Sequence, residues 1–394
     1  MIQLWRTVPV QTFDAEATIA LGRDRPELLA VAQLALDAGR PIGGRDVTRE
    51  LLGGLPEHVG WLVIDRCVHL GLLQQRGSRG PAELTEGGSI ALEHGQVLVA
   101  EEGVFRFYLA ADPLLDAALL HVAPLRSASA KESRDTLYEA KKGNAQHPQG
   151  GPPPNVLRQV ALNQVLLSVV NGSMFEVRDA PRVGQAGPGG NVRLDLRWEP
   201  DGPAVVLVSG QLPGPGDEAA PLKADFRVET PKELRSISYD TMWTALVEFA
   251  SEVPSAMLTQ WRQLAKRRVL PASLAQLPEA ARRSFSRDVE VPPVRFGQIG
   301  EFQASKMQKV ELVPASQADA LEWCHWLQWD AVSQGYATPA MVDAAAAKIR
   351  ARFPHHSPRQ MSAQDLLARA HRERADRRSW NLLAPSDLGL WSNG

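Results

Sequence analysis

Apolar side chains recur at helical spacing in three successive segments near the start of the chain. The first segment covers 26–39, begins at a proline, which suits the first position of a helix, and ends at a glycine. A short segment over 46–52 and a longer one over 56–71 follow, with a pair of glycines between them. This pattern predicts three consecutive helices.

The pattern changes after these helices to short segments in which turn residues interrupt apolar runs. We expect a strand over 83–85, a turn or short helix over 86–94, and a hairpin over 97–108. The hairpin is expected to turn at its Glu-Glu-Gly sequence, because glycine favours tight turns. The order is therefore three helices, a strand and a hairpin.

Residues 25–110 resemble the winged-helix family, both in this order of elements and in the Leu-Thr-Glu-Gly-Gly stretch at 84–88. Winged helices contact DNA or another protein, so the resemblance implies a binding domain over 1–125. It implies no catalytic residue. The rest of the chain resembles no family on these grounds.

The next two regions differ sharply in composition. Residues 126–155 are rich in Ser, Lys, Gly, Asn and Gln and include three consecutive prolines, which predicts a flexible linker. In 156–235 we expect a helix over 156–170 followed by a small mixed sheet. Residues 192–198 alternate apolar and charged side chains, so one face of this sheet should be wet or covered by a partner. The strands are expected at 175–178, 192–198, 205–209 and 226–229.

The last region, 236–394, is predicted to be mainly helical. Thr338-Pro339 and the Ser362-to-Asp365 capping sequence mark the starts of two of its helices. The predicted fold class is therefore α+β: an N-terminal winged helix, a linker, a small mixed β-sheet region and a helical C-terminal region. The helices of the last region are expected near 241–251, 254–268, 317–334, 339–353 and 362–378.

The composition is that of an ordinary globular protein, with 394 residues, 44% hydrophobic and 22% charged. Cys67 and Cys324 each lie inside an apolar helical run, which predicts buried thiols and supports neither a disulfide framework nor a Cys-based zinc site. No stretch approaches about 18 uninterrupted apolar residues, and the first residues lack the pattern of a secretory signal. We therefore expect a cytoplasmic protein without a membrane segment.

Charge is divided unevenly along the chain, although the formal net charge is only −2. Residues 1–120 carry ten Lys or Arg against sixteen Asp or Glu. By contrast, 261–310 carry ten against four, and 347–380 carry nine against three. The front of the chain is acidic and the back is basic.

The helix over 56–71 occupies the place of a recognition helix, which in DNA readers presents basic and amide side chains to the duplex. Here Arg66 stands against Glu57 and Asp65 in an acidic domain, whereas affinity for DNA depends mainly on the number of neutralised phosphates. This favours packing or protein pairing over DNA reading. If DNA is read, the expected winged-helix contacts are Arg66, Arg76 and Arg79.

The basic segments of the back half are a second candidate surface for nucleic acid. Two plain alternatives exist, since cations also favour helix C-termini and a charged helix can simply be solvated. The candidate contacts are Arg262, Lys266, Arg267, Arg268, Arg282, Arg283, Arg287, Arg372 and Arg377.

Tryptophans gather in the C-terminal region at helical spacing. Trp323, Trp326 and Trp329 favour core packing, because a platform for stacking bases would need exposed rings beside cations. The closing segment 380–391 is apolar for a chain end, and we expect it to dock on its own domain or on a partner.

Groupings that could support catalysis are few. His355 and His356 are adjacent, so their side chains diverge, and no carboxylate stands at a metal-ligand spacing from them. The glycine-rich stretch 187–190 lacks the lysine and helix of a phosphate loop. We therefore expect no catalytic residue, no metal, no cofactor and no small-molecule substrate.

One enzymatic alternative remains, a metal-dependent nuclease with carboxylates and a lysine on neighbouring strands. The spacing of its last two candidates is three residues, and the plainer interpretation is that these carboxylates pair with Arg193 and Arg197. The nuclease candidates are Glu176, Asp195, Asp225, Glu229 and Lys232.

These patterns favour a non-enzymatic adaptor or scaffold subunit of a prokaryotic complex acting on DNA, of the kind found in defence or chromosome-maintenance assemblies. Its expected partners are other protein subunits or a second copy, with DNA as a further candidate. The alternatives are a winged-helix transcriptional regulator and the metal-dependent nuclease.

Overall fold

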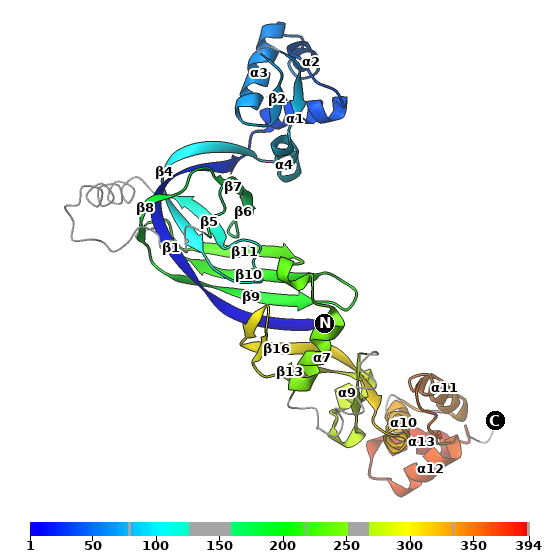
Figure 1. Cartoon of the computed structure of the whole chain (residues 1–394). Coiled ribbons are helices and arrows are strands. Elements are labelled where there is room, and N and C mark those ends of the chain that lie inside the picture. Colours follow the sequence, from blue (N-terminus) through cyan, green and yellow to red (C-terminus); the bar gives the residue numbers. More distant parts are fainter. Residues whose placement is uncertain (78–79, 126–158, 217–218, 251–267, 333–334, 392–394) are drawn as a thin grey trace.

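The computed structural model describes residues 1–77, 80–125, 159–216, 219–250, 268–332 and 335–391. The chain forms an elongated molecule: a helical unit lies at one end, a large sheet forms the middle, and the C-terminal helices form the other end (Figure 1). Helices and strands are both abundant, so the predicted α+β class is confirmed. The predicted linker 126–155 lies outside the described residues. Within the described ranges, no helix is long and apolar enough to cross a membrane.

The chain begins with β1 (Ile2–Arg23), a long strand that runs through the middle of the molecule and that the sequence pattern did not predict. Its alternate residues at the start of the chain are buried, as expected for a strand with one face on a core. The first half of β1 pairs with β9 (Gly190–Trp198) and β16 (Ala304–Pro314). Because β1 belongs to the sheet, the expectation that the chain opens with a winged-helix domain is corrected.

The second half of β1 pairs antiparallel with β4 (Val97–Leu109) along the full length of β4. The predicted hairpin over 97–108 is therefore wrong, and β4 is one continuous strand. The residues expected to form its turn, Glu101 to Gly103, pair instead with residues 17–19 of β1. The pairing with β1 satisfies the backbone groups of β4, and this long-range contact outweighs the local turn signal.

The helical unit is inserted between β1 and β4 and lies beyond the end of their ribbon (Figure 1). Its core is distinct from that of the sheet and includes Ile42, Val47, Ile64 and Cys67. Ile42 also forms a β-bridge with Ala82, which ties the first helix connection to the hairpin that follows the third helix. The three predicted helices are confirmed. The unit consists of α1 (Pro26–Ala38), α2 (Gly44–Glu50), α3 (Glu57–His69), β2 (Leu73–Gln75), β3 (Ala82–Leu84) and α4 (Glu86–His94).

The central sheet has twelve strands among the described residues and is much larger than the small sheet expected at 156–235. Its main path runs β11–β10–β9–β1–β16–β12, and only β12 and β16 pair in parallel, so the sheet is mixed as predicted. The predicted helix over 156–170 is wrong where it is described, because residues 165–167 form a strand. The remaining strands are β5 (Leu119–Pro124), β6 (Val165–Leu167), β7 (Met174–Val177), β8 (Arg182–Ala186), β10 (Ala204–Leu212), β11 (Leu222–Glu229), β12 (Val269–Ala272) and β13 (Ser286–Val291).

Val169 joins two edges of this sheet. Its N–H donates to the carbonyl of Leu120 on β5, and its carbonyl accepts from the N–H of Asp225 on β11. Since β5 reaches β1 through β4, and β11 reaches β1 through β10 and β9, the sheet curls around an apolar core. The helix α7 (Tyr239–Phe249) packs its buried side chains into the same core.

Strands also occur in the region expected to be mainly helical. β12, β13 and β16 extend the central sheet, and β14 (Val294–Phe296) pairs with β15 (Gly300–Phe302). The expected helix at 254–268 lies outside the described residues except for its last residue. Short helical turns separate these strands: η1 (Lys232–Leu234), η3 (Leu274–Gln276) and α9 (Glu279–Ser284).

Four helices form the C-terminal end, with their own core around Trp329, Val332, Leu366 and Leu382. The predicted helix over 362–378 is in fact two helices, because Asp376 caps a new one by accepting from the N–H of Arg378. The capping box predicted at Ser362 is confirmed. The helices are α10 (Gln317–Ala331), α11 (Pro339–Arg350), α12 (Ala363–Arg372) and α13 (Arg377–Asp387).

Candidate docking surfaces at the two ends

Exposed apolar side chains gather at the two ends of the molecule. Single exposed apolar residues are ordinary, but a concentration of them marks a surface that another molecule covers. In the described part of the chain, only Leu162 and Phe249 lie between the ends. The large exposed apolar residues of the ends are Leu36, Leu51, Leu55 and Leu62 in the helical unit, and Tyr336, Met341, Trp380, Leu388 and Leu390 in the C-terminal helices.

At the N-terminal end, α1, α2 and α3 enclose a groove of about 400 Å³. Leu62 of α3 is its most exposed apolar member, with 65% of its surface accessible. Glu27 and Arg66 are its only charged lining residues. The groove is therefore apolar with a charge of each sign at its rim. Its apolar lining is Leu28, Ala30, Val31, Val47, Leu51, Leu52, Val59, Leu62 and Val63.

The exposure of Leu62 follows from how α3 packs. Gly60 lies so close to α2 that a Cβ there would stand 2.1 Å from the carbonyl oxygen of Gly44. This contact, together with the burial of Ile64 and Cys67, fixes which side of α3 faces inward. Leu62 is left on the outer side, where a DNA reader would present polar groups.

The predicted winged-helix contacts are only partly described. Arg66 is exposed on the rim of the groove, and Arg76 is exposed in the turn between β2 and β3. Arg79 lies outside the described residues. The structure brings Arg66 beside apolar side chains, and contact of these arginines with DNA stays a prediction.

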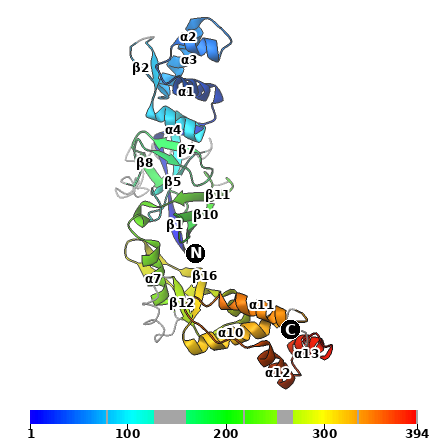
Figure 2. The same ribbon diagram turned by 90° about the vertical axis from the view of Figure 1, so that its right-hand side faces the viewer.

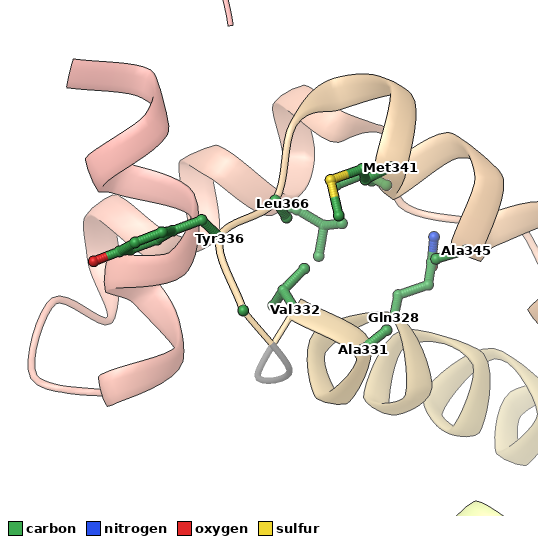
Figure 3. A pocket seen from close by; sticks show the side chains of 10 residues that line it. Gln328, Ala331, Val332, Tyr336, Met341, Ala345 and Leu366 are labelled. Carbon is green, nitrogen blue, oxygen red and sulfur yellow. The ribbon is translucent and has the colours of Figure 1, made fainter. Parts of the chain in front are cut away.

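At the C-terminal end, a smaller hollow of about 230 Å³ lies among α10, α11 and α12. Figure 3 shows Val332, Met341 and Leu366 converging on it, with the ring of Tyr336 turned to one side. Its one amide side chain is already engaged: Gln328 Nε2 donates to the carbonyl of Met361, and Gln328 Oε1 accepts from the N–H of the same residue. The hollow therefore offers apolar contact and little polar recognition.

The last helix, α13, carries an apolar stripe on its exposed side. Trp380 and Leu388 are 61% and 76% exposed, and Ala384 lies midway between them at helical spacing. Leu382 and Leu383 face inward and are buried. Trp391 donates to the carbonyl of Ala337, so the prediction that the chain end docks on its own domain is confirmed for part of this segment.

Several of the predicted nucleic-acid contacts have structural partners instead. Arg268 binds Asp240 with a 2.6 Å hydrogen bond and lies over the ring of Tyr239. Arg283 makes two 2.8 Å hydrogen bonds to Asp330, which raise the pKa of the guanidinium. Arg282 donates from Nε to the carbonyl of Leu277. The others on this stretch are Arg287, half-buried on β13, and Arg262, Lys266 and Arg267, which lie outside the described residues.

The C-terminal arginines differ from these. Arg372, Arg374 and Arg377 are exposed, and none of them forms an ion pair with a residue that the structure describes. They lie on or next to α12 and α13, close in sequence to the apolar stripe. The freely accessible positive charge of this end is therefore at 372–377.

The nuclease carboxylates are each beside a cation. Asp195 is buried on the sheet face, where it accepts from Gln3 and lies 3.4 Å from Arg197 and 4.0 Å from Arg193. This confirms the plainer interpretation of Asp195. Glu176, Asp225 and Glu229 pair in the same way with Arg178, Lys223 and Arg227 of their own strands. Lys232 lies apart, in a short turn beyond β11.

No group of three or more His, Cys, Asp or Glu that could hold a metal ion occurs within the described ranges. His356 instead lies with Nε2 3.2 Å from the carbonyl of Pro314. The two cysteines are buried as predicted, and burial raises the pKa of both thiols to about 11. Trp323 and Trp329 are buried in the cores, so the packing prediction for the tryptophans is confirmed for these two.

Sequence reasoning missed one polar pair that has the residue types of a nucleophile and a base. Ser168 Oγ lies 2.8 Å from Nδ1 of His121, and burial lowers the pKa of His121 to about 4. Ser168 Oγ also accepts from the N–H of Val170. Ser168 is 1% exposed and His121 is 9% exposed, so this pair is out of reach of a substrate and stabilises the fold. The two residues are far apart in sequence, and no motif marks them.

Comparisons with protein-family models, with curated proteins and with solved structures find no match to this chain. Its function must therefore be inferred from the chain's own surfaces.

Proposed function

We propose that this protein is a non-enzymatic adaptor that docks other proteins through apolar surfaces at both ends. The observation that carries the proposal is the groove among α1, α2 and α3, with Leu62 exposed over 65% of its surface at its edge. An apolar surface of this kind is costly to leave in water, whereas burial against a partner stabilises it by about 25 cal/mol per Å². The long sheet between the ends would then hold the two partners apart.

We further propose that the helical unit is a winged helix used for docking. Support comes from the order of three helices and the β2–β3 hairpin, and from the bridge between Ile42 and Ala82 that ties the unit together. In this assignment α3 is the equivalent of a recognition helix. It presents Leu62 between its charged residues, which suits a protein surface better than a polyanion.

The shape of the groove favours a helix as its occupant. Its lining comes from α1, α2, α3 and the turn after α2, and so offers no strand edge with free backbone groups. A bound segment must therefore satisfy its own backbone hydrogen bonds, which a helix does and an extended peptide does not. The expected partner element is an amphipathic helix with apolar residues at spacings of three and four.

A synthetic peptide tests this proposal. The probe is a fluorescent amphipathic helix with leucines at spacings of three and four, compared with a peptide of the same composition in scrambled order. We expect saturable binding of the first peptide to the full chain, lost on Leu62→Glu and retained on Leu36→Glu, a leucine 52% exposed outside the groove lining. Equal binding of the two peptides, or binding unaffected by Leu62→Glu, would overturn the proposal.

A second candidate function, contact with nucleic acid at the C-terminal end, is favoured by the three exposed arginines at 372–377 that lack a described ion-pair partner. This would place the adaptor in a complex that acts on DNA. Binding of duplex and single-stranded oligonucleotides should then weaken with salt, and reversing all three charges should flatten the salt dependence. An unchanged slope would remove this candidate. A transcriptional regulator would instead lose DNA binding on Arg66→Glu and Arg76→Glu, while the described carboxylates lend the nuclease alternative no support.

A further inference from the structure

We propose that one partner of this adaptor is a second copy of the same chain, with the exposed stripe of α13 seated in the groove of the next molecule's helical unit. The inference rests on the proposed function, because it uses the same groove. It goes further by naming the occupant. Both halves of the interface are already formed on the chain.

The first half is the groove, whose helical walls call for an amphipathic helix. The second half is α13, an amphipathic helix with one face unpartnered. Its inner face is held by Leu382 and Leu383, while Trp380, Ala384 and Leu388 form a stripe at spacings of four on the outer face. Because α13 is folded and anchored before it binds, little conformational entropy is lost on association. A large exposed aromatic residue on such a stripe is a common anchor of protein interfaces.

The two halves cannot meet within one molecule. The helical unit and α13 lie at opposite ends of the elongated chain in both views (Figures 1 and 2). Contact between them must therefore join two copies. Since the two surfaces differ, the contact is head-to-tail, and each copy added leaves one groove and one α13 free. Such an interface builds chains or closed rings and not a symmetric dimer.

Charge favours this pairing over a symmetric one. Residues 1–120 carry sixteen acidic side chains against ten basic ones, whereas 347–380 carry nine basic against three acidic. Close to the apolar contacts, Asp65 follows Leu62 by one helical turn, and Arg377 precedes Trp380 by one turn. Both charged side chains are exposed without a described ion-pair partner. Groove against groove would bring acidic ends together, whereas groove against α13 joins acidic to basic.

Sedimentation velocity of the full chain over a range of concentrations tests the association. We expect larger species as concentration rises, and fewer of them as salt rises. Leu62→Glu and Trp380→Glu should each weaken association by about tenfold or more, since each places a charge in an apolar contact. Leu388→Glu provides a second variant on α13. Leu36→Glu and Leu162→Glu change exposed leucines outside both surfaces and should leave association intact, with circular dichroism confirming that every variant is folded.

Mixing two variants separates this arrangement from any other. The Leu62→Glu chain keeps an intact α13, and the Trp380→Glu chain keeps an intact groove. We expect each to be monomeric alone and the mixture to form a one-to-one pair that does not grow. A mixture that stays monomeric overturns the proposal, as does a Trp380→Glu chain that associates like the unmodified one, which would indicate a groove-to-groove dimer.

The two proposals can fail separately. If the unmodified chain is monomeric at every concentration, head-to-tail assembly is wrong. Binding of the amphipathic probe peptide at Leu62 would then still support docking of another protein. If the probe does not bind either, the adaptor proposal fails with it.

Discussion

Trp323 and Trp329 lie on the same helix, α10, but their indoles are buried in two different cores. Trp323 stacks on Phe285 in the core of the sheet, with ring centroids 4.3 Å apart, and donates to the carbonyl of Arg282. Trp329 is buried in the C-terminal core and donates to Asp376, which caps α13. α10 therefore connects the middle of the molecule to its C-terminal end, and the position of α13 depends on it.

Replacing each tryptophan should destabilise a different part of the molecule. Removing such a buried ring costs about 3–5 kcal/mol. We expect Trp329→Ala to speed amide hydrogen exchange in α12 and α13 while the sheet stays protected. Trp323→Ala should instead speed exchange in β13 and β16, which carry the sheet core at this end. Equal effects of the two changes on both regions would show that the cores do not act separately.

The ion pair between Asp14 and Arg106 is buried in the β1–β4 ribbon, with both side chains 5% exposed. Arg106 donates to both carboxylate oxygens of Asp14 and to the carbonyl of Gly214. Removing one partner leaves a buried charge unpaired, so Asp14→Asn should lower the free energy of unfolding by about 3–5 kcal/mol. Urea unfolding measures this change. Asp225→Asn breaks an exposed pair with Lys223 and should change stability by less than about 0.5 kcal/mol.

The buried His121 should make stability fall in mild acid. Burial lowers the pKa of His121 to about 4 in the folded protein, whereas an unfolded histidine titrates near about 6.5. Between these values the unfolded chain binds a proton that the folded one does not, so stability decreases as pH falls from about 6.5 toward 4. The expected loss from this group is about 3 kcal/mol by pH 4.

Denaturant unfolding at several pH values tests the role of His121. In His121→Gln the stability at pH 7 is lower, but its decrease between pH 6.5 and 4 should be shallower, because the titrating group is gone. His58 is exposed on α3, and His58→Gln should leave the pH dependence as it was. A His121→Gln chain with an unchanged slope would contradict the assignment.

Gly60 should not tolerate alanine, although alanine normally stabilises a helix interior by about 0.5–1 kcal/mol relative to glycine. A Cβ at Gly60 would lie 2.1 Å from the carbonyl oxygen of Gly44, so α2 and α3 would have to separate. We expect Gly60→Ala to destabilise the helical unit by about 1–3 kcal/mol and to weaken binding of the probe peptide. A Cβ at Gly297 would meet no atom within 4 Å, which makes Gly297→Ala the matched control. A more stable Gly60→Ala chain would mean that this close approach does not shape the groove.

Elements set by local periodicity and capping could be predicted from the sequence. The three helices of the N-terminal unit and the box at Ser362 follow from side chains within a few residues of one another. β1 and β4 could not be predicted in this way, because their structure depends on a distant partner. The Glu-Glu-Gly at 101–103 signals a turn locally, but pairing with β1 keeps it in a continuous strand.

The candidate site was harder to predict for the same reason. Leu62 lies in an apolar run with Trp61, Val63 and Ile64, and periodicity alone does not single out the exposed residue. Its exposure depends on the approach of α3 to α2 at Gly60. The occupation of Arg283 by Asp330, 47 positions away, likewise has no local signal.

The central claim is that a protein helix, and not DNA, meets α3 at Leu62. The most direct measurement places a photo-crosslinking phenylalanine analogue at position 62 of the full chain and identifies by mass spectrometry what it captures in the cells that produce the protein. We expect crosslinked peptides from an amphipathic helix, either α13 of a second copy or a helix of another protein, and far fewer from the same analogue at position 36. Crosslinked nucleotides at position 62, or no adduct beyond the level at position 36, would contradict the account.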